Sequence, residues 1–326
     1  MIVPDHWAEA RRQHRARRRQ VTVRRFGWSD SSAAEAQAMA ERRADEALQQ
    51  ILAGQPLARL ERLAAYNGAE GLPIREEVLA RHGEEVITRN AYGARCLNSP
   101  CALFADIDFS EAPRGRHILI ALLLLTLLSV AIGLAAGSAA LGGGLWVLCL
   151  LAAGPLVAWV QRLALLAKGG HEGVAMQRIQ RFLAAHPAWN LRVYRTPGGL
   201  RLLATHAPFE ATAPEVATFF SAVGADPVYV RMCRHQRCFR ARLSAKPWRI
   251  GIGQHMRPRP GVWPVHPSQL ARRQAWVAAY EQAAAGYAAC QFQTTLGSGQ
   301  VHPRLRGVIE LHDREARAGE RGVGVA

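Results

Sequence analysis

The feature that most constrains this chain is an uncharged segment, residues 117–161, in which 45 consecutive residues include no Asp, Glu, Lys or Arg. A helix needs about 20 apolar residues to cross a bilayer, so one span cannot account for the whole segment. We predict two spans, 118–136 and 145–167, with a turn near 137–144 where three glycines are consecutive. The alternative is a buried helical hairpin in a soluble protein, although soluble core helices rarely stay uncharged for so long.

Basic residues flank both ends of this predicted transmembrane hairpin. Arg114 and Arg116 precede it, Arg162 and Lys168 lie at its far end, and the connecting turn carries no charge. Positively charged flanks of membrane helices remain on the cytoplasmic side. We therefore expect a multi-pass protein of the cell (inner) membrane with both termini in the cytoplasm.

The predicted hairpin, residues 117–167, lies between two polar arms. We expect a basic flexible arm over 1–31, a helical segment with the first strands over 32–116, a C-terminal α+β part over 168–318 and a flexible tail over 319–326. Capping residues and hydrophobic periodicity predict helices over 32–53, 57–66, 73–82, 174–185, 212–224, 268–286 and 302–316. Alternation and turn residues predict strands over 85–90, 95–98, 102–109, 191–196, 200–205, 237–244 and 290–295. The soluble part is therefore predicted to be α+β, a mostly antiparallel sheet with flanking helices, interrupted by the two-helix hairpin.

The position of the hairpin allows two domain organisations. The two ends of a helical hairpin lie about 10 Å apart, so a hairpin can interrupt a single domain without separating its halves. The strand over 102–109 and the helix over 174–185 would then be consecutive elements of one fold. The alternative is a separate domain on each side of the hairpin.

Two acidic side chains share one face of the strand predicted over residues 102–109. Side chains alternate along a strand, so Asp106 and Asp108 point to one face and the apolar residues point to the other. Two such carboxylates suit Mg²⁺ or Mn²⁺, and metals held in this way can clamp a transferring phosphoryl group. The alternative is a strand end whose acidic residues face solvent.

This hydrophobic-Asp-hydrophobic-Asp pattern resembles the first catalytic motif of the archaeo-eukaryotic primase-polymerase superfamily. In that superfamily a helix follows, and then a hairpin with a Gly-x-His or similar motif; here Arg201 stands in the place of the histidine. The family also has a third acidic residue on a later strand, for which Asp226 is a candidate. The resemblance implies a metal-dependent nucleotidyl or phosphoryl transferase, with Asp106 and Asp108 as catalytic and metal-binding residues. The exchange of the histidine for Arg201 leaves a catalytically degenerate form open.

A long stretch near the C-terminal side, residues 227–280, carries no Asp or Glu but many arginines and interleaved aromatic residues, in a chain of formal net charge +16. Such a stretch suits a nucleic-acid backbone with stacked bases, an anionic lipid leaflet, or a solvated basic surface. The candidate phosphate- or nucleic-acid-binding residues are Arg201, Arg237, Arg240, Arg242, Lys246 and Arg249. The rival function is a non-catalytic membrane scaffold whose basic face binds anionic lipid or a protein partner.

Four of the six cysteines form two pairs with the same spacing, Cys96 with Cys101 and Cys233 with Cys238. Four thiolates can close a tetrahedral Zn²⁺ site, which would tie the two arms together. The alternative is that they are small buried hydrophobic residues. In a cytoplasmic compartment we expect reduced thiols and no disulfide framework.

Overall fold

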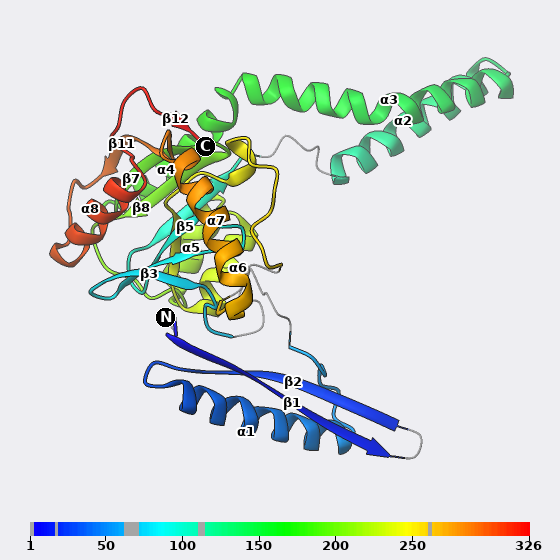
Figure 1. Cartoon of the computed structure of the whole chain (residues 1–326). Coiled ribbons are helices and arrows are strands. Elements are labelled where there is room, and N and C mark those ends of the chain that lie inside the picture. Colours follow the sequence, from blue (N-terminus) through cyan, green and yellow to red (C-terminus); the bar gives the residue numbers. More distant parts are fainter. Residues whose placement is uncertain (1–2, 17–18, 62–71, 110–114, 260–262) are drawn as a thin grey trace. The chain divides into compact units, whose positions relative to one another are not determined.

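The computed structural model describes residues 3–16, 19–61, 72–109, 115–259 and 263–326 (Figure 1). The chain divides into two compact units: unit 1 comprises Met1–Ile107 and Phe182–Ala326, and unit 2 comprises Asp108–Arg181. Unit 1 combines helices with mostly antiparallel sheets, and unit 2 is helical. The predicted α+β class, interrupted by a helical hairpin, is therefore confirmed.

The segment expected to be a flexible arm, residues 1–31, is a β-hairpin instead. β1 (His6–Ala16) and β2 (Arg19–Ser29) pair antiparallel, and α1 (Ala33–Leu52) packs on them (Figure 1). Val21 and Val23, two residues apart on β2, are fully buried against the alanine-rich face of this helix. Their alternation with polar residues is the strand pattern, which the high arginine content of the segment conceals.

The prediction of a helix over residues 73–82 is wrong, because this region contains the strand β3 (Glu77–His82). β3 pairs antiparallel with β4 (Glu85–Arg89) through a turn at Gly83, whose φ is 63°. A glycine with positive φ ends many helices and also closes β-hairpins, so it marks a chain reversal without identifying the element before it.

Two further expectations about this part of the fold are wrong. Residues 57–61 of the helix expected over 57–66 are not helical, and Leu60 forms a β-bridge to Arg24; the remainder lies outside the described residues. The expected flexible tail contains β12 (Gly324–Val325), which pairs in parallel with β10 (Tyr287–Ala288). Both segments are ordered by pairing with distant residues, which local sequence does not reveal.

Two four-stranded sheets contain strands from both arms of the chain. One has the order β3-β4-β5-β9 and is antiparallel throughout, and the other has the order β11-β7-β8-β6. The strands not yet introduced are β5 (Arg95–Ser99), β6 (Phe104–Asp108), β7 (Asn190–Thr196), β8 (Gly199–Ala204), β9 (Phe239–Arg242) and β11 (Gln291–Gly297). Since β5 neighbours β9 and β6 neighbours β8, one domain interrupted by the hairpin is the correct alternative.

Helices flank these sheets (Figure 1). They are α5 (Pro214–Val223), α6 (Pro227–Gln236), α7 (Pro267–Ala284) and α8 (Arg306–Glu315), with short 3₁₀ turns η1 (Pro247–Arg249) and η2 (Pro303–Leu305). A further helix, α4 (Gly170–Ala185), begins in unit 2 and ends in unit 1. In unit 1, Phe182, Trp189 and Phe219 form an aromatic cluster with ring centroids 4.9 to 5.2 Å apart. Such aromatic packing joins helices and strands into one core.

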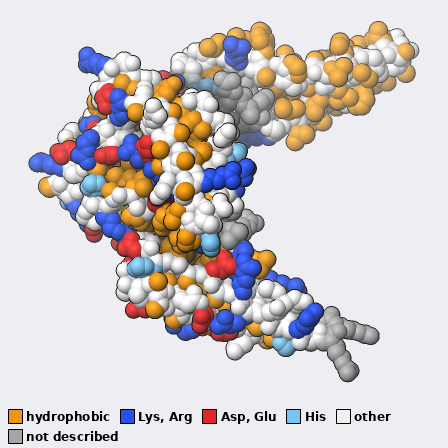
Figure 2. Space-filling model, in the orientation of Figure 1, with side chains coloured by type: hydrophobic (Ala, Val, Ile, Leu, Met, Phe, Trp, Pro, Cys, Tyr) orange, Lys and Arg blue, Asp and Glu red, His pale blue; other side chains and the backbone are white. Residues whose placement is uncertain are grey.

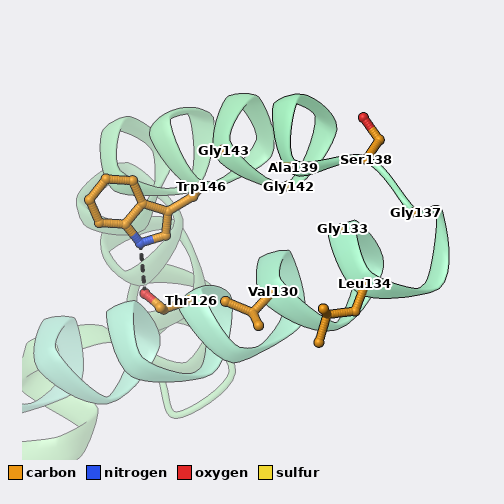
Figure 3. Close-up of a pocket in the computed structure, with 10 residues that line it drawn as sticks. All are labelled: Thr126, Val130, Gly133, Leu134, Gly137, Ser138, Ala139, Gly142, Gly143 and Trp146. Carbon is orange, nitrogen blue, oxygen red and sulfur yellow. Dashed lines mark hydrogen bonds between the residues drawn. The ribbon is translucent and has the colours of Figure 1, made fainter.

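Unit 2 contains two antiparallel helices, α2 (Gly115–Ala135) and α3 (Ala139–Leu166), which are long and apolar enough to cross a membrane. Hydrophobic side chains cover much of their surface (Figure 2). The helices also make polar contacts with each other: His117 Nδ1 lies 2.6 Å from Gln161 Nε2, and Trp146 Nε1 donates to Thr126 Oγ1 at 3.1 Å (Figure 3). The two helices therefore form a hairpin that is joined along its length.

The turn of this hairpin is shorter than expected, because α3 begins at Ala139 and residues 142–144 lie inside it. Ser138 caps the helix by accepting a hydrogen bond from the Leu141 N–H at 3.2 Å. Gly142 packs directly on Gly133 of α2 (Figure 3). A Cβ added to Gly133 would lie only 2.9 Å from the Cα of Gly142. This glycine serves close helix approach and not the turn.

Candidate functional site

The two acidic residues of β6 lie on the strand as their alternation predicts. Ala105 and Ile107 are buried, whereas Asp106 is half-buried and Asp108 is exposed. Their shared face is therefore the more accessible face of the strand. Whether they form a metal site depends on what already contacts their carboxylates.

Arg201 of the neighbouring strand β8 binds both carboxylate oxygens of Asp106. Its Nε donates to Oδ1 at 2.8 Å, one terminal nitrogen donates to Oδ2 at 3.1 Å, and the other donates to the main-chain oxygen of Arg242 at 2.8 Å. Burial lowers the pKa of Arg201, but the Asp106 carboxylate more than offsets this, and the net shift is upward. The guanidinium is thus charged, buried and fully engaged inside the protein.

Asp226, the candidate for a third acidic residue, has a structural role. Its carboxylate caps α6 by accepting hydrogen bonds from the N–H groups of Val228 and Tyr229, both at 3.1 Å. A hard divalent cation needs several free oxygen ligands. Among the described residues, no three His, Cys, Asp or Glu side chains converge to hold a metal ion. The Asp106 carboxylate is already bound by Arg201, so a divalent cation there would have to displace the guanidinium.

Arg240, expected to bind phosphate, is also buried and paired. Its terminal nitrogen contacts Glu76 Oε2 at 2.6 Å, and Thr88 Oγ1 donates to the same oxygen at 2.6 Å. Burial lowers the pKa of Arg240, but the Glu76 carboxylate more than offsets this, so the net shift is upward. Half-buried Arg242 donates to two main-chain oxygens at 2.6 and 3.1 Å. Together with Arg201, these arginines bind internal partners.

The four cysteines proposed as a zinc site are free, buried thiols, namely Cys96, Cys101, Cys233 and Cys238. They do not converge into a metal cluster among the residues that the structure describes. Cys96 Sγ instead accepts a hydrogen bond from Asn90 at 3.3 Å. Burial raises the pKa of Cys238 to about 11, so its neutral thiol is favoured. Their geometry agrees with the packing alternative.

The remaining three predicted phosphate-binding residues lie nearer the surface. Arg237 is exposed and ends α6 with a φ of 49°. Lys246 Nζ lies 5.5 Å from the ring centroid of Trp248, which is 55% exposed and is followed by Arg249 in η1. Tyr92 packs edge-on against this indole at 5.3 Å. This combination of cation and aromatic ring is the arrangement expected from the composition of residues 227–280.

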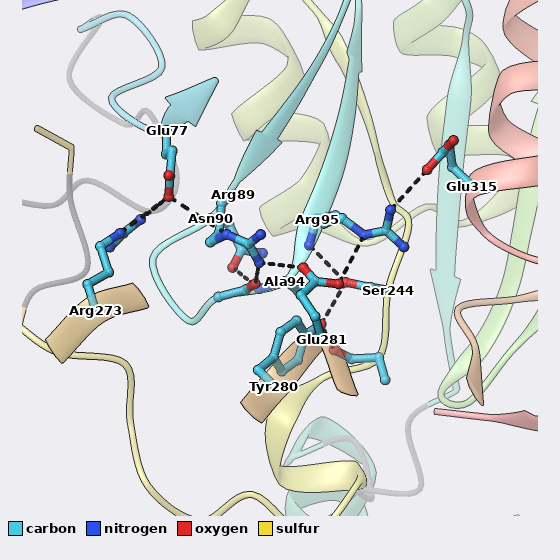
Figure 4. Close-up of polar contacts among 12 residues, drawn as sticks. Glu77, Arg89, Asn90, Ala94, Arg95, Ser244, Arg273, Tyr280, Glu281 and Glu315 are labelled. Carbon is cyan, nitrogen blue, oxygen red and sulfur yellow. Dashed lines mark hydrogen bonds and ion pairs between the residues drawn. The ribbon is translucent and has the colours of Figure 1, made fainter. Parts of the chain in front are cut away.

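A network of ion pairs joins α7 and α8 to the antiparallel sheet β3-β4-β5-β9 (Figure 4). The pairs are Arg89–Glu77, Arg89–Glu281, Arg95–Glu281, Arg95–Glu315 and Arg273–Glu77, with nitrogen–oxygen distances of 3.7, 2.8, 3.8, 2.9 and 2.8 Å. Tyr280 adds a hydrogen bond of 2.6 Å to Ser244 Oγ. These contacts hold one face of α7 against the sheet and leave its other face toward a cleft.

That cleft has a volume of about 710 Å³ and lies between α7 and the loop that follows η1. We call it the basic cleft, and its lining residues are Gly253, Gln254, His255, Arg257, Arg272, Ala275, Trp276 and Ala279. None of these residues is acidic. Within the described part of the chain, neither Arg257 nor Arg272 has a carboxylate partner. The basic cleft thus presents uncommitted positive charge.

Trp276 is held rigidly at the wall of the basic cleft. Its ring stacks on Tyr280 with centroids 5.3 Å apart and planes 7° apart, and its Nε1 donates to the Gln254 main-chain oxygen at 3.0 Å. The indole also touches Gly93, where an added Cβ would lie 2.3 Å from the ring and where φ is 97°. Only glycine fits there. These three contacts hold the indole in place at the wall of the cleft.

The sequence located the basic cleft only in part. Arg257, Arg272 and Trp276 all belong to the acid-free stretch, but the six predicted binding residues did not include them, and His255 gave no separate pattern. The contact that aligns them, between α7 and a loop, is not encoded in any short motif. No protein-family model, curated protein or solved structure matches the chain.

Proposed function

We propose that this protein is a membrane-anchored, non-catalytic binding protein whose unit 1 binds the phosphate groups of nucleotide or single-stranded nucleic acid in the basic cleft. One observation carries the proposal: Arg257 and Arg272 line the same cleft as a fixed indole, Trp276, with no acidic residue in the lining. Arginine forks match phosphate oxygens bidentately, and an indole face accepts a stacked base.

If the protein is related to enzymes of the primase-polymerase type, we propose that it has lost their catalytic metal site. Asp106, the first acidic residue of the motif, is bound by the Arg201 that replaces the family's histidine. A carboxylate neutralised in this way is a poor ligand for a metal that must displace the guanidinium. Ligand binding in the basic cleft is therefore expected to need no divalent cation.

Equilibrium binding of a fluorescent oligo(dT) tests the proposal, with the full chain in detergent micelles and a chelator present. Arg257→Ala and Arg272→Ala should each weaken binding about tenfold, because each removes one charged hydrogen-bonding partner of a phosphate. Arg234→Ala is the matched control, since Arg234 is exposed on α6 outside the cleft, and it should change affinity less than about twofold. Replacing the chelator by Mg²⁺ should leave these ratios unchanged.

Two results would contradict this function. Cleft variants that bind oligo(dT) as tightly as the wild type would remove the basic cleft from the site. Wild-type protein that binds vesicles rich in acidic lipid, but neither ATP nor oligo(dT), would assign the basic surface to the membrane scaffold function.

Unit 2 supplies the proposed membrane anchor. We infer that α2 and α3 cross the bilayer as a pair and return the chain to the cytoplasmic side, because the connecting turn is uncharged and the flanks are basic. The protein should stay with membranes in alkaline carbonate. Reporter fusions at both termini should show cytoplasmic activity; fusions that report opposite sides would contradict the two-span topology.

A further inference from the structure

A second cavity, of about 360 Å³, lies where the turn between β3 and β4 meets the chain at Cys101 and the start of α8. Its wall combines Glu85, Cys101 and Arg304 with the apolar side chains of Val308 and Leu311. None of these residues lines the basic cleft. The cavity is therefore distinct from the basic cleft.

Glu85 is the residue in this cavity that lacks a partner for one of its polar atoms. Its side chain is only 9% exposed, and its Oε1 accepts a hydrogen bond from Ser99 Oγ at 3.1 Å. Its Oε2 is buried and has no hydrogen-bond partner among the described residues. An unsatisfied buried carboxylate oxygen is costly, and a donor supplied from outside would remove that cost.

Among the described residues, no basic side chain forms an ion pair or hydrogen bond with Glu85, although Arg304 lies on the same cavity wall and favours its charged form. The groups around the cavity are the carboxylates of Glu84 and Glu310, the basic side chains of His82, Arg304 and Arg314, and the thiol of Cys101. Arg304 pairs with the exposed Glu84 instead. Burial raises the pKa of Glu85 to about 7, although its hydrogen bond from Ser99 acts in the opposite direction.

We propose that this cavity binds an aliphatic cation, with an ammonium or guanidinium group at Glu85 and a hydrocarbon stem along Val308 and Leu311. Such a group brings both the N–H donors and the positive charge that Glu85 lacks. The volume is at the lower end for ligand pockets, which suits a group the size of one amino-acid side chain. The same chemistry belongs to a free amine and to an arginine or lysine side chain of a partner protein.

Calorimetric titration of the full chain in micelles tests the proposal with n-butylguanidinium and its uncharged analogue n-butylurea. The cation should bind and the urea should not. Glu85→Gln keeps the shape of the side chain but removes its charge, and it should weaken binding of the cation at least about tenfold. Glu215→Gln, which changes an exposed acid in the first turn of α5 outside the cavity, should keep affinity within about twofold.

The pH dependence of cation binding gives a second test, which uses the wild-type protein alone. Binding should strengthen from pH 6 to pH 8, since Glu85 must release its proton to pair with a guanidinium that stays charged throughout. Equal binding of butylguanidinium and butylurea, or binding that does not change with pH, would overturn the proposal. Undiminished binding to a folded Glu85→Gln variant would overturn it as well.

A capped arginine peptide separates the two sources of the cation. If it binds as tightly as butylguanidinium, the cavity receives a side chain of a partner protein. If it binds at least about tenfold more weakly, the extra main chain does not fit and the ligand is a free amine.

Discussion

Arginines in two regions of unit 1 are in opposite electrostatic states. Inside the domain, Arg201 and Arg240 are buried and each contacts a carboxylate, at 2.8 and 2.6 Å. In the basic cleft, Arg257 and Arg272 are open to a cavity and pair with no carboxylate of the described chain. A basic composition therefore predicts affinity for polyanions only where the charges have no internal partner.

The contrast is sharpest between two consecutive residues of α7. Arg273 is 2% exposed and pairs with Glu77 at 2.8 Å, whereas Arg272 is exposed and lines the basic cleft. Neighbouring positions on a helix point in different directions, so one can be structural and the next free for a ligand. Variants of these residues can therefore separate stability from binding.

The largest expected effect is at the Asp106–Arg201 pair. Asp106→Ala leaves a buried guanidinium without its carboxylate and should lower the free energy of unfolding by about 4 kcal/mol. Asp108→Ala, at the exposed end of the same strand, should change it by less than about 0.5 kcal/mol. Denaturant unfolding monitored by tryptophan fluorescence measures both. Equal losses would contradict a buried pair.

Arg273 should show a somewhat smaller loss. Arg273→Ala removes a buried cation that contacts Glu77 and should lower the free energy of unfolding by about 3 kcal/mol. Affinity of the folded protein for oligo(dT) should stay within about twofold of wild type, because the side chain lies away from the cleft lining. A selective loss of binding with normal stability would show that this arginine belongs to the site.

Glu85 tests the same rule with the opposite charge, since it is a buried carboxylate that forms no ion pair with a described residue. Its pKa is raised from 4.5 to about 7, so the stability from its neutral form is complete below pH 4.5 and is lost as pH rises through 7. Relative to Glu85→Gln, the wild type should lose on the order of 2 kcal/mol between pH 4.5 and pH 8. Unfolding curves at several pH values measure this difference, and parallel pH profiles would contradict it.

Arg272 should show little change in stability and a clear change in binding. Arg272→Ala should alter the free energy of unfolding by less than about 0.5 kcal/mol, because the side chain is exposed and has no carboxylate partner in the described chain. The same variant should lose about tenfold in oligo(dT) affinity. A stability loss as large as that of Arg273→Ala would remove the distinction between the two arginines.

The sequence predicted the helices and strands of this fold better than it predicted which of them contact one another. Local patterns located β4 to β8, α4 and the helical hairpin, and Ser32 caps α1 as expected, by accepting a hydrogen bond from the Glu35 N–H. The β1–β2 hairpin was missed because arginines interrupt its valine alternation. The triple glycine was assigned to the turn because only the structure shows Gly142 against Gly133.

From the sequence, the candidate site could be predicted only as an arginine-rich, acid-free segment, residues 227–280. Arg240 and Glu76 are 164 positions apart in sequence, and Arg201 and Asp106 are 95 apart, so no local pattern distinguishes these paired arginines from free ones. The acid-free stretch did contain the cleft residues Arg272 and Trp276. Whether an arginine of α7 faces the cleft or an internal carboxylate depends on which face of the helix the ion pairs of Figure 4 hold against the sheet.

Ultraviolet cross-linking of oligo(dT) to the full protein, followed by mass spectrometry of the peptides, tests the central claim most directly. The basic cleft predicts cross-links in peptides that contain His255 or Trp276, and weaker cross-linking of both at the same oligo(dT) concentration in Arg272→Ala. Cross-links confined to the strands around Arg201 and Arg240 would contradict it, because those arginines would then have exchanged their carboxylate partners for the ligand.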